Sequence, residues 1–195
     1  MFSAISESIT KKLEEAHAIK SEDREIYLYG VKQGLTILLN LITICAIGIV
    51  SKMLWQSILF MAAYIPLRSF AGGYHAKTPL RCYIYSIIMI ILVSVGMKYL
   101  LFVDMVYYVI LAISALIIFV LSPAEDKNKP LDKIELKVYR KRTSLILLVE
   151  LIICILSNVI DLRTVFISII YNLAVMSVII LLGMLKSKLS GLFLL

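Results

Sequence analysis

The chain has 195 residues, of which 61% are hydrophobic, and its 20 lysines and arginines exceed its 13 acidic residues, giving a formal net charge of +7. Soluble domains are about 45–50% apolar, so this composition excludes an ordinary soluble domain and predicts an integral membrane protein. The positive charge lies between apolar runs, which favours a role in membrane topology over nucleic-acid binding. Three cysteines and two histidines provide neither a disulfide framework nor a usual zinc site.

The first element is predicted in residues 1–30. Apolar side chains recur there at three- or four-residue intervals from Phe2 to Ile19, with lysine and glutamate between them. This pattern indicates an amphipathic helix that lies in the headgroup region of a membrane. A solvated helix packed on the cytoplasmic loops is an equal alternative, and we interpret His17 as a surface residue on this helix.

The next elements are six apolar runs. Very short segments follow the first, third and fifth runs, whereas long polar loops follow the second and fourth. A membrane-spanning helix needs about 20 residues, with a range of about 17–25, and five of the runs meet that range. The second run is short and ends in Pro66, so we expect it to be tilted, extended by Phe70, or partly re-entrant. The runs cover residues 31–51, 54–67, 83–101, 105–122, 144–160 and 164–185.

The predicted fold is therefore an all-α integral membrane protein, one polytopic domain over residues 1–195. It has about six transmembrane helices and the interfacial helix, or five spans with a re-entrant segment. With six spans, only Lys52, Lys98 and Arg163 lie on one side, and every other lysine and arginine lies on the opposite side. The positive-inside rule then places both termini and the loops 66–82 and 123–142 in the cytoplasm.

The loop 66–82 holds the two side chains with the clearest chemical potential, His75 and Cys82. A thiol and an imidazole are the minimum parts of a cysteine nucleophile with its general base. Thr78-Pro79 is typical of a helix start, which puts Cys82 in the first turn of the third span, where the helix N-terminus stabilises a thiolate. Gly72-Gly73 permits the chain to bend so that His75 approaches Cys82. Amides of these glycines or of that first turn are candidate donors to an oxyanion.

Other residues and chemistries give weaker indications. Glu150 lies inside an apolar run, where an ionisable side chain is rare and is a functional-site hypothesis. It is expected to pair with a basic side chain of the site, or to reach toward the cytoplasmic face. Cys45 and Cys154 are interpreted as small apolar residues. The six-span layout also fits a small peptide exporter or a non-catalytic accessory protein, in which His75 and Cys82 are merely structural.

Two segments resemble one known family. Arg68-Ser-Phe-Ala-Gly-Gly-Tyr-His-Ala-Lys-Thr-Pro-Leu-Arg-Cys82 and Ser122-Pro-Ala-Glu-Asp-Lys-Asn-Lys-Pro-Leu131 are similar to the accessory gene regulator B (AgrB) family, and the resemblance covers nearly the whole chain. It implies a membrane cysteine endopeptidase of Gram-positive bacteria that processes the precursor of a quorum-sensing peptide. His75 and Cys82 then form the catalytic pair, and no cofactor is expected.

The resemblance also implies a substrate. It is a short precursor with an amphipathic leader and an acidic C-terminal tail, cut through an acyl-enzyme that closes a thiolactone or lactone ring. By family analogy, a homodimer is a candidate oligomeric state. Basic residues of both loops are expected to bind the acidic tail: Arg68, Lys77, Arg81, Lys127, Lys129, Lys133, Arg140, Lys141 and Arg142.

Overall fold

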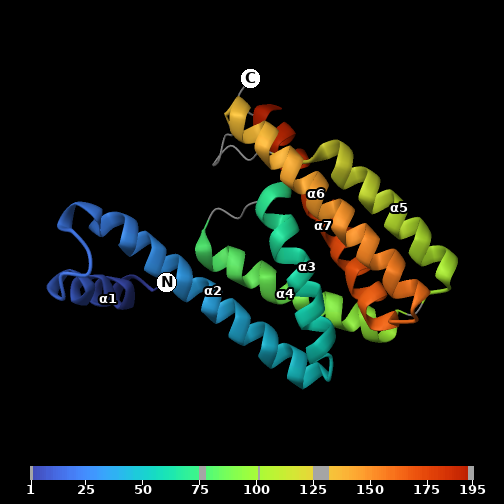
Figure 1. The fold of residues 1–195 in the computed structure, drawn as a ribbon, viewed down its shortest axis with the longest axis horizontal. Coiled ribbons are helices and arrows are strands. Elements are labelled where there is room, and N and C mark those ends of the chain that lie inside the picture. Colours follow the sequence, from blue (N-terminus) through green and yellow to red (C-terminus); the bar gives the residue numbers. More distant parts are fainter. Residues whose placement is uncertain (1, 75–77, 101, 125–131, 193–195) are drawn as a thin grey trace.

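A computed structural model describes residues 2–74, 78–100, 102–124 and 132–192. Within these residues the chain is helical, apart from turns and one isolated β-bridge, which confirms the predicted all-α class. Figure 1 shows the helices, which in chain order are α1 (Ser3–Glu15), the 3₁₀ turn η1 (Ser21–Asp23), α2 (Arg24–Ser51), α3 (Leu54–Ala71), α4 (Pro79–Tyr99), α5 (Asp104–Leu121), α6 (Lys133–Val159) and α7 (Arg163–Leu192).

Five helices of the described chain are long and apolar enough to cross a bilayer, namely α2, α4, α5, α6 and α7. The protein is thus a multi-pass membrane protein, and six spans is an approximate description of it. The helix α3 is the remaining segment of the six expected. It continues past Pro66 to Ala71, so the run that ends at Pro66 in the sequence is extended through Phe70, as one alternative predicted.

Tight turns join the helices at one end of the bundle, which we call the turn end. The turns α2–α3, α4–α5 and α6–α7 are as short as the sequence indicated. Lys52 adopts a left-handed conformation after α2, and the Met53 N–H donates to the Gly48 carbonyl at 2.8 Å. A Cβ on Gly48 would lie 2.9 Å from the Leu54 Cα, so the glycine lets α3 fold back closely. The opposite end, where α3 and α7 finish and α4 and α6 begin, is called the loop end.

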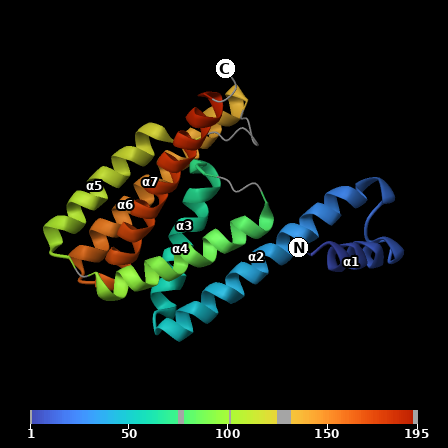
Figure 2. The same cartoon turned by 180° about the vertical axis from the view of Figure 1, so that it is seen from behind.

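The main core surrounds α7, which packs against α3, α4, α5 and α6. Figures 1 and 2 show α7 lying along α5 and α6 and crossing beside α3. Its buried side chains include Phe166, Leu173 and Met176, and they meet Leu67 of α3 and Ile118 of α5. Because the outward faces of the spans carry large exposed apolar side chains, the bundle presents an apolar belt to lipid.

A second core cluster joins α2, α3 and α4 on the other side of α3. Phe60 and Ile90 are fully buried in it, and α2 contributes the buried Ile44 and the half-buried Ile47. Thr43 of α2 and Tyr83 of α4 also share a hydrogen bond of 2.8 Å between their hydroxyls. The position of α4, and with it the start of this helix near Cys82, therefore depends on both α2 and α3.

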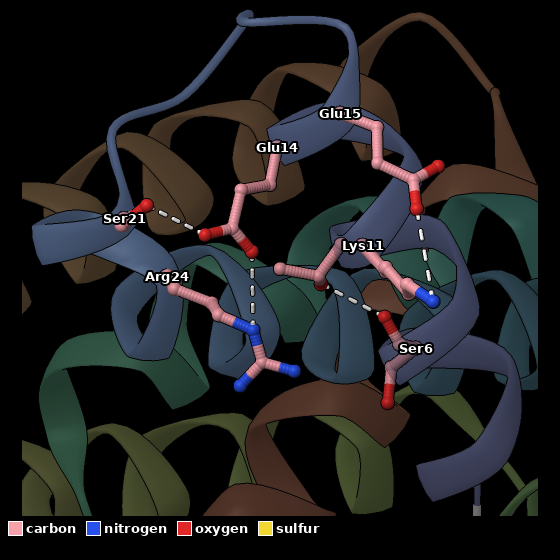
Figure 3. A network of polar contacts seen from close by, with 7 residues as sticks. Ser6, Lys11, Glu14, Glu15, Ser21 and Arg24 are labelled. Carbon is pink, nitrogen blue, oxygen red and sulfur yellow. Dashed lines mark hydrogen bonds and ion pairs between the residues drawn. The ribbon is translucent and has the colours of Figure 1, made fainter.

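The predicted N-terminal helix is present as α1, and it folds back along α2 (Figure 1). Its buried side chains are Ser6 and Thr10, whose hydroxyls donate to carbonyls of their own helix, Thr10 to the Ser6 carbonyl at 2.8 Å. Figure 3 shows how the next segment is tied to it: Glu14 accepts a hydrogen bond of 2.6 Å from Ser21 and pairs with Arg24 at 3.4 Å. The fully buried side chains of α1 are therefore hydroxyl side chains.

Part of the apolar side of α1 is exposed, although Phe2 and Leu13 are half-buried. Ile5 is 52% exposed and Ile9 36% exposed. An amphipathic helix that leaves its apolar side outward retains that side for a lipid surface or for another molecule.

Candidate functional site

The start of α4 holds Cys82 as the sequence predicted. Thr78 is extended, its hydroxyl accepts the Arg81 N–H at 3.3 Å, and Pro79 follows in the first helical turn. The Cys82 N–H donates to the Thr78 carbonyl at 3.0 Å, and the Cys82 side chain is exposed. The helix cap thus fixes the Cys82 backbone in the first turn while the thiol stays accessible.

The other part of the loop, Gly72–Tyr74, is anchored to the segment that follows α5. The Gly73 N–H donates to the Ala124 carbonyl at 3.1 Å, and the Ala124 N–H donates to the Ala71 carbonyl at 2.9 Å. Gly72 and Gly73 have φ values of 72° and 105°, which favour glycine. A Cβ on Gly72 would also collide with the Ala124 carbonyl oxygen. These glycines therefore allow the loop to pack directly against Ala124, in addition to allowing the chain to bend.

α7 supports the same segment from a distant part of the sequence. The Tyr74 N–H donates to the Ile179 carbonyl at 3.1 Å, although an α7 carbonyl would normally bond within its own helix. A Cβ on Gly183 would lie 2.7 Å from both the Gly73 carbonyl carbon and the Tyr74 nitrogen. The absence of a side chain at Gly183 is what lets the loop lie directly on α7.

Arg68, in the last turn of α3, holds the loop from within. Its guanidinium donates to the carbonyl of Gly72 and, at 2.6 Å, to the carbonyl of Tyr74. The planar guanidinium suits such a two-point contact. Arg68 was expected to bind substrate, and in this structure its donors face the loop.

Aromatic rings and cations surround the anchored loop. Tyr74 packs edge-on against Tyr85 of α4 at 5.9 Å between ring centroids, and Lys186 of α7 lies 4.9 Å from the Tyr74 ring. A hydrogen bond with Tyr85 raises the pKa of Tyr74 above its ordinary value. On the α6 side, Arg142 lies 5.0 Å from the ring of Phe70. The site therefore has a cationic rim.

The remaining predicted site residues are brought together only in part. His75, Lys77, Lys127 and Lys129 lie outside the described residues. Arg81 is exposed beside Cys82. The others lie exposed on the first three turns of α6, namely Lys133, Arg140, Lys141 and Arg142. α6 begins with a capping box of Asp132 and Glu135. Of the four basic residues, Arg142 contacts the end of α3.

Glu150 differs from its expected arrangement. It is 6% exposed, so it does not reach the cytoplasmic face, and its partner is the amide of Asn172 in place of a basic side chain. The expectation failed because it considered only ionisable partners, whereas amides also bond across helices. Cys154, one turn further along α6, is fully buried as expected, while Cys45 of α2 is exposed.

Sequence reasoning missed the residues that contact the loop from distant parts of the chain, and it missed Asn172, the partner of Glu150. Gly183 and Asn172 carry a readable signal, because an isolated glycine or amide inside an apolar helix indicates close packing or a polar contact. Ile179 and Ala124 contribute backbone carbonyls, which any residue supplies, so no side-chain pattern could have identified them.

Comparisons with known proteins point to one family. The family described as accessory gene regulator B matches residues 6–189. Two curated proteins of Clostridium perfringens, whose names describe them as AgrB-like, are 28% identical (strain SM101) and 27% identical (strain 13) over 165 residues. Each alignment covers 80% of this chain and 77% of the relative. No solved structure matches the chain.

Proposed function

The chain belongs to the accessory gene regulator B family, whose members take part in quorum-sensing peptide processing, and from this premise we propose that it is a membrane-embedded cysteine endopeptidase. The observation that carries the proposal is that an exposed Cys82 thiol lies at the capped start of α4, next in the chain to a loop whose glycines are anchored by backbone hydrogen bonds. His75 belongs to that same loop and precedes the cap residue Thr78 by three positions in the sequence.

The proposed reaction begins with proton transfer from Cys82 to His75. The thiolate attacks a peptide carbonyl near the C-terminal end of the precursor, forming a carbon–sulfur bond. As the peptide C–N bond breaks, the imidazolium of His75 returns the proton to the leaving amine. The helix N-terminus contributes a favourable field for the thiolate at Cys82.

The developing oxyanion needs a donor whose hydrogen is not already used. The Gly73 amide donates to Ala124, and the amides of Arg81 and Cys82 donate to Thr78. Pro79 has no N–H, so the first-turn amide that remains is that of Leu80. We assign Leu80 this role, with Gly72 as the alternative predicted from the sequence.

The acyl-enzyme then passes its acyl group to a side chain of the precursor itself. A precursor thiol or hydroxyl attacks the thioester, the bond to the Cys82 sulfur breaks, and a thiolactone or lactone ring closes with release of the Cys82 thiolate. Exchange of one thioester for another is close to isoenergetic, so exclusion of water from the site favours ring closure over hydrolysis.

The proposed partner is a short peptide with an amphipathic leader and an acidic tail. The basic first turns of α6 meet the loop where Arg142 covers Phe70, and Lys186 covers Tyr74, so the acidic tail has cations on both sides of the loop. Following the distribution of lysine and arginine, we place the loop end and both termini in the cytoplasm of a Gram-positive cell. A homodimer is the proposed assembly.

The test is co-expression with an acidic-tailed precursor in membranes, with products identified by mass spectrometry. Cys82→Ser and His75→Ala should each abolish cleavage, and the wild type should carry a precursor-derived thioester on Cys82. Cys45→Ser is the matched control, because Cys45 is another exposed thiol and lies on α2. His17→Asn is the control for His75, since His17 has a φ of 54° that asparagine tolerates.

Both controls should process the precursor as the wild type does. Unchanged products in Cys82→Ser would refute the peptidase and point to an exporter or an accessory protein.

A further inference from the structure

α6 and α7 carry a polar pair in the apolar interior of the bundle. Glu150 of α6 is 6% exposed and Asn172 of α7 is fully buried. The Asn172 Nδ2 donates to the Glu150 Oε2 at 2.9 Å. Two oxygens of the pair, Glu150 Oε1 and Asn172 Oδ1, find no hydrogen-bond partner among the described residues.

An ionised Glu150 would leave this pair with two buried acceptors and no donor to match them. A carboxylate and an amide oxygen both only accept hydrogen bonds, and a buried polar atom without a partner costs about 1–3 kcal/mol. Cations do not compensate, because no lysine or arginine is among the buried residues of the part of the chain that the structure describes. The titratable side chain that follows on the same face of α6 is the thiol of Cys154.

We propose that Glu150 is a neutral carboxylic acid that closes a two-bond ring with Asn172 and locks α6 to α7. In this ring the Oε1–H donates to the Asn172 Oδ1, while the Asn172 Nδ2 donates to the Oε2. A single proton on Oε1 therefore pairs both oxygens: it makes Oε1 a donor and gives the Asn172 Oδ1 a hydrogen bond to accept. Neutrality also removes the large cost of a charge inside a bilayer.

The pair lies at the same distance along each helix from the residues that contact the loop. Tyr139 precedes Glu150 by eleven residues on α6, and Gly183 follows Asn172 by eleven residues on α7. Eleven residues return to within about 20° of the same helix face and span about 16 Å. Both of these residues contact the loop 66–82: Tyr139 packs edge-on against Phe70 at 5.6 Å between ring centroids, and Gly183 lies against the Gly73–Tyr74 peptide.

Glu150 and Asn172 are thus positioning residues for the loop, a role that rests on the proposed function. Because α6 and α7 run in opposite directions, a slip of one helix against the other would separate Phe70 from Tyr139 or Tyr74 from Ile179. The ring fixes the register at which both helices reach the loop together.

Infrared spectroscopy of the protein in lipid at neutral pH tests the ring without any substrate. The wild type should show the carbonyl stretch of a protonated, hydrogen-bonded carboxyl group, and Glu150→Gln should lack it. A carboxylate band assigned to Glu150 in that difference spectrum would overturn the proposal. This readout stands even if no precursor is ever processed, so its failure is distinct from failure of the proposed function.

Precursor processing tests the positioning role. Glutamine at position 150 can donate to the Asn172 Oδ1 and accept from its Nδ2, so Glu150→Gln should process the precursor within about twofold of the wild type. Glu150→Met and Asn172→Leu each leave one buried polar side chain unpaired and should lower processing by about tenfold or more, the equivalent of roughly 1.4 kcal/mol. Loss in Glu150→Gln equal to that in Glu150→Met would show that a charged carboxylate is required, which contradicts the ring.

Discussion

α2 and α7 are both long apolar helices, of 28 and 30 residues, yet they have opposite places in the molecule. Half of the most apolar stretch of α7 is buried inside the protein, against 11% for α2. The glycines show the same contrast. Gly183 of α7 has no room for a Cβ, whereas at Gly30 and Gly34 of α2 the Cβ position has no heavy atom within 4 Å apart from the adjoining backbone of the same helix.

This contrast shows that apolar composition alone does not define what a helix does. α7 is the internal support of the loop, through the Ile179 carbonyl and the bare surface of Gly183. The loop-end half of α2 offers its surface, together with α1, to lipid or to another molecule (Figure 2). Substitutions on α7 should therefore alter the loop directly, while those on this half of α2 should leave it in place.

Among the substitutions that test this contrast, the largest effect is expected from Gly183→Ala. The new methyl group would meet the Gly73–Tyr74 peptide at 2.7 Å, and because both sides are backbone, the loop or the helix must shift. Overpacking of this kind costs about 1–3 kcal/mol, so precursor processing should fall by about tenfold or more. Processing is followed by mass spectrometry, and thermal unfolding in lipid reports the stability.

Gly34→Ala is the matched control on α2. Alanine is favoured over glycine by about 0.5–1 kcal/mol within a helix, and the added methyl group enters open space, so stability and processing should be retained. Equal losses in the two variants would contradict the division between a supporting α7 and a peripheral α2.

A smaller loss is expected from Arg68→Lys. The lysine keeps the charge but presents one ammonium in place of a planar fork, so it cannot hold the Gly72 and Tyr74 carbonyls in the same geometry. Lysine retains the charge and can keep one of the two hydrogen bonds, so the loss should lie at the lower end of the range of about 1.5–3 kcal/mol for a hydrogen bond to a charged group, which predicts roughly a tenfold decrease in processing. Arg81→Lys, at an exposed position beside Cys82, should process the precursor within about twofold of the wild type. A loss as large as that of Arg68→Lys would show that the planar guanidinium is not specifically required at position 68.

The sequence predicted what depends on neighbouring residues. The apolar runs gave the helices, and Thr78-Pro79 gave the start of α4 with Cys82 in its first turn. It could not predict the contacts that close the loop, because Ala124 and Ile179 contribute main-chain carbonyls from about 50 and 105 residues further along the chain. It also gave Glu150 the wrong kind of partner, since the pairing with Asn172 depends on how α6 and α7 pack.

Removal of the cap at α4 should have a moderate effect. Thr78→Ala deletes the hydroxyl that accepts the Arg81 N–H, which typically costs about 1 kcal/mol, and should lower processing by about fivefold by loosening the turn that carries Cys82. Thr78→Asp keeps a capping oxygen and should process the precursor at close to the wild-type rate. Equal loss in both variants would mean that the cap does not position Cys82.

The smallest effect is expected where α1 joins α2. Glu14→Gln removes the charge that pairs with Arg24 at 3.4 Å but leaves an oxygen to accept from Ser21. Both side chains of the ion pair are partly exposed, at 42% for Arg24 and 30% for Glu14, and such pairs contribute about 0.2–1 kcal/mol. Processing should therefore change by less than about twofold, measured beside Gly183→Ala in the same membranes. A loss comparable to that of Gly183→Ala would place α1 and α2 among the elements that hold the loop, because a weak surface pair can have so large an effect only if the site depends on the contact it maintains.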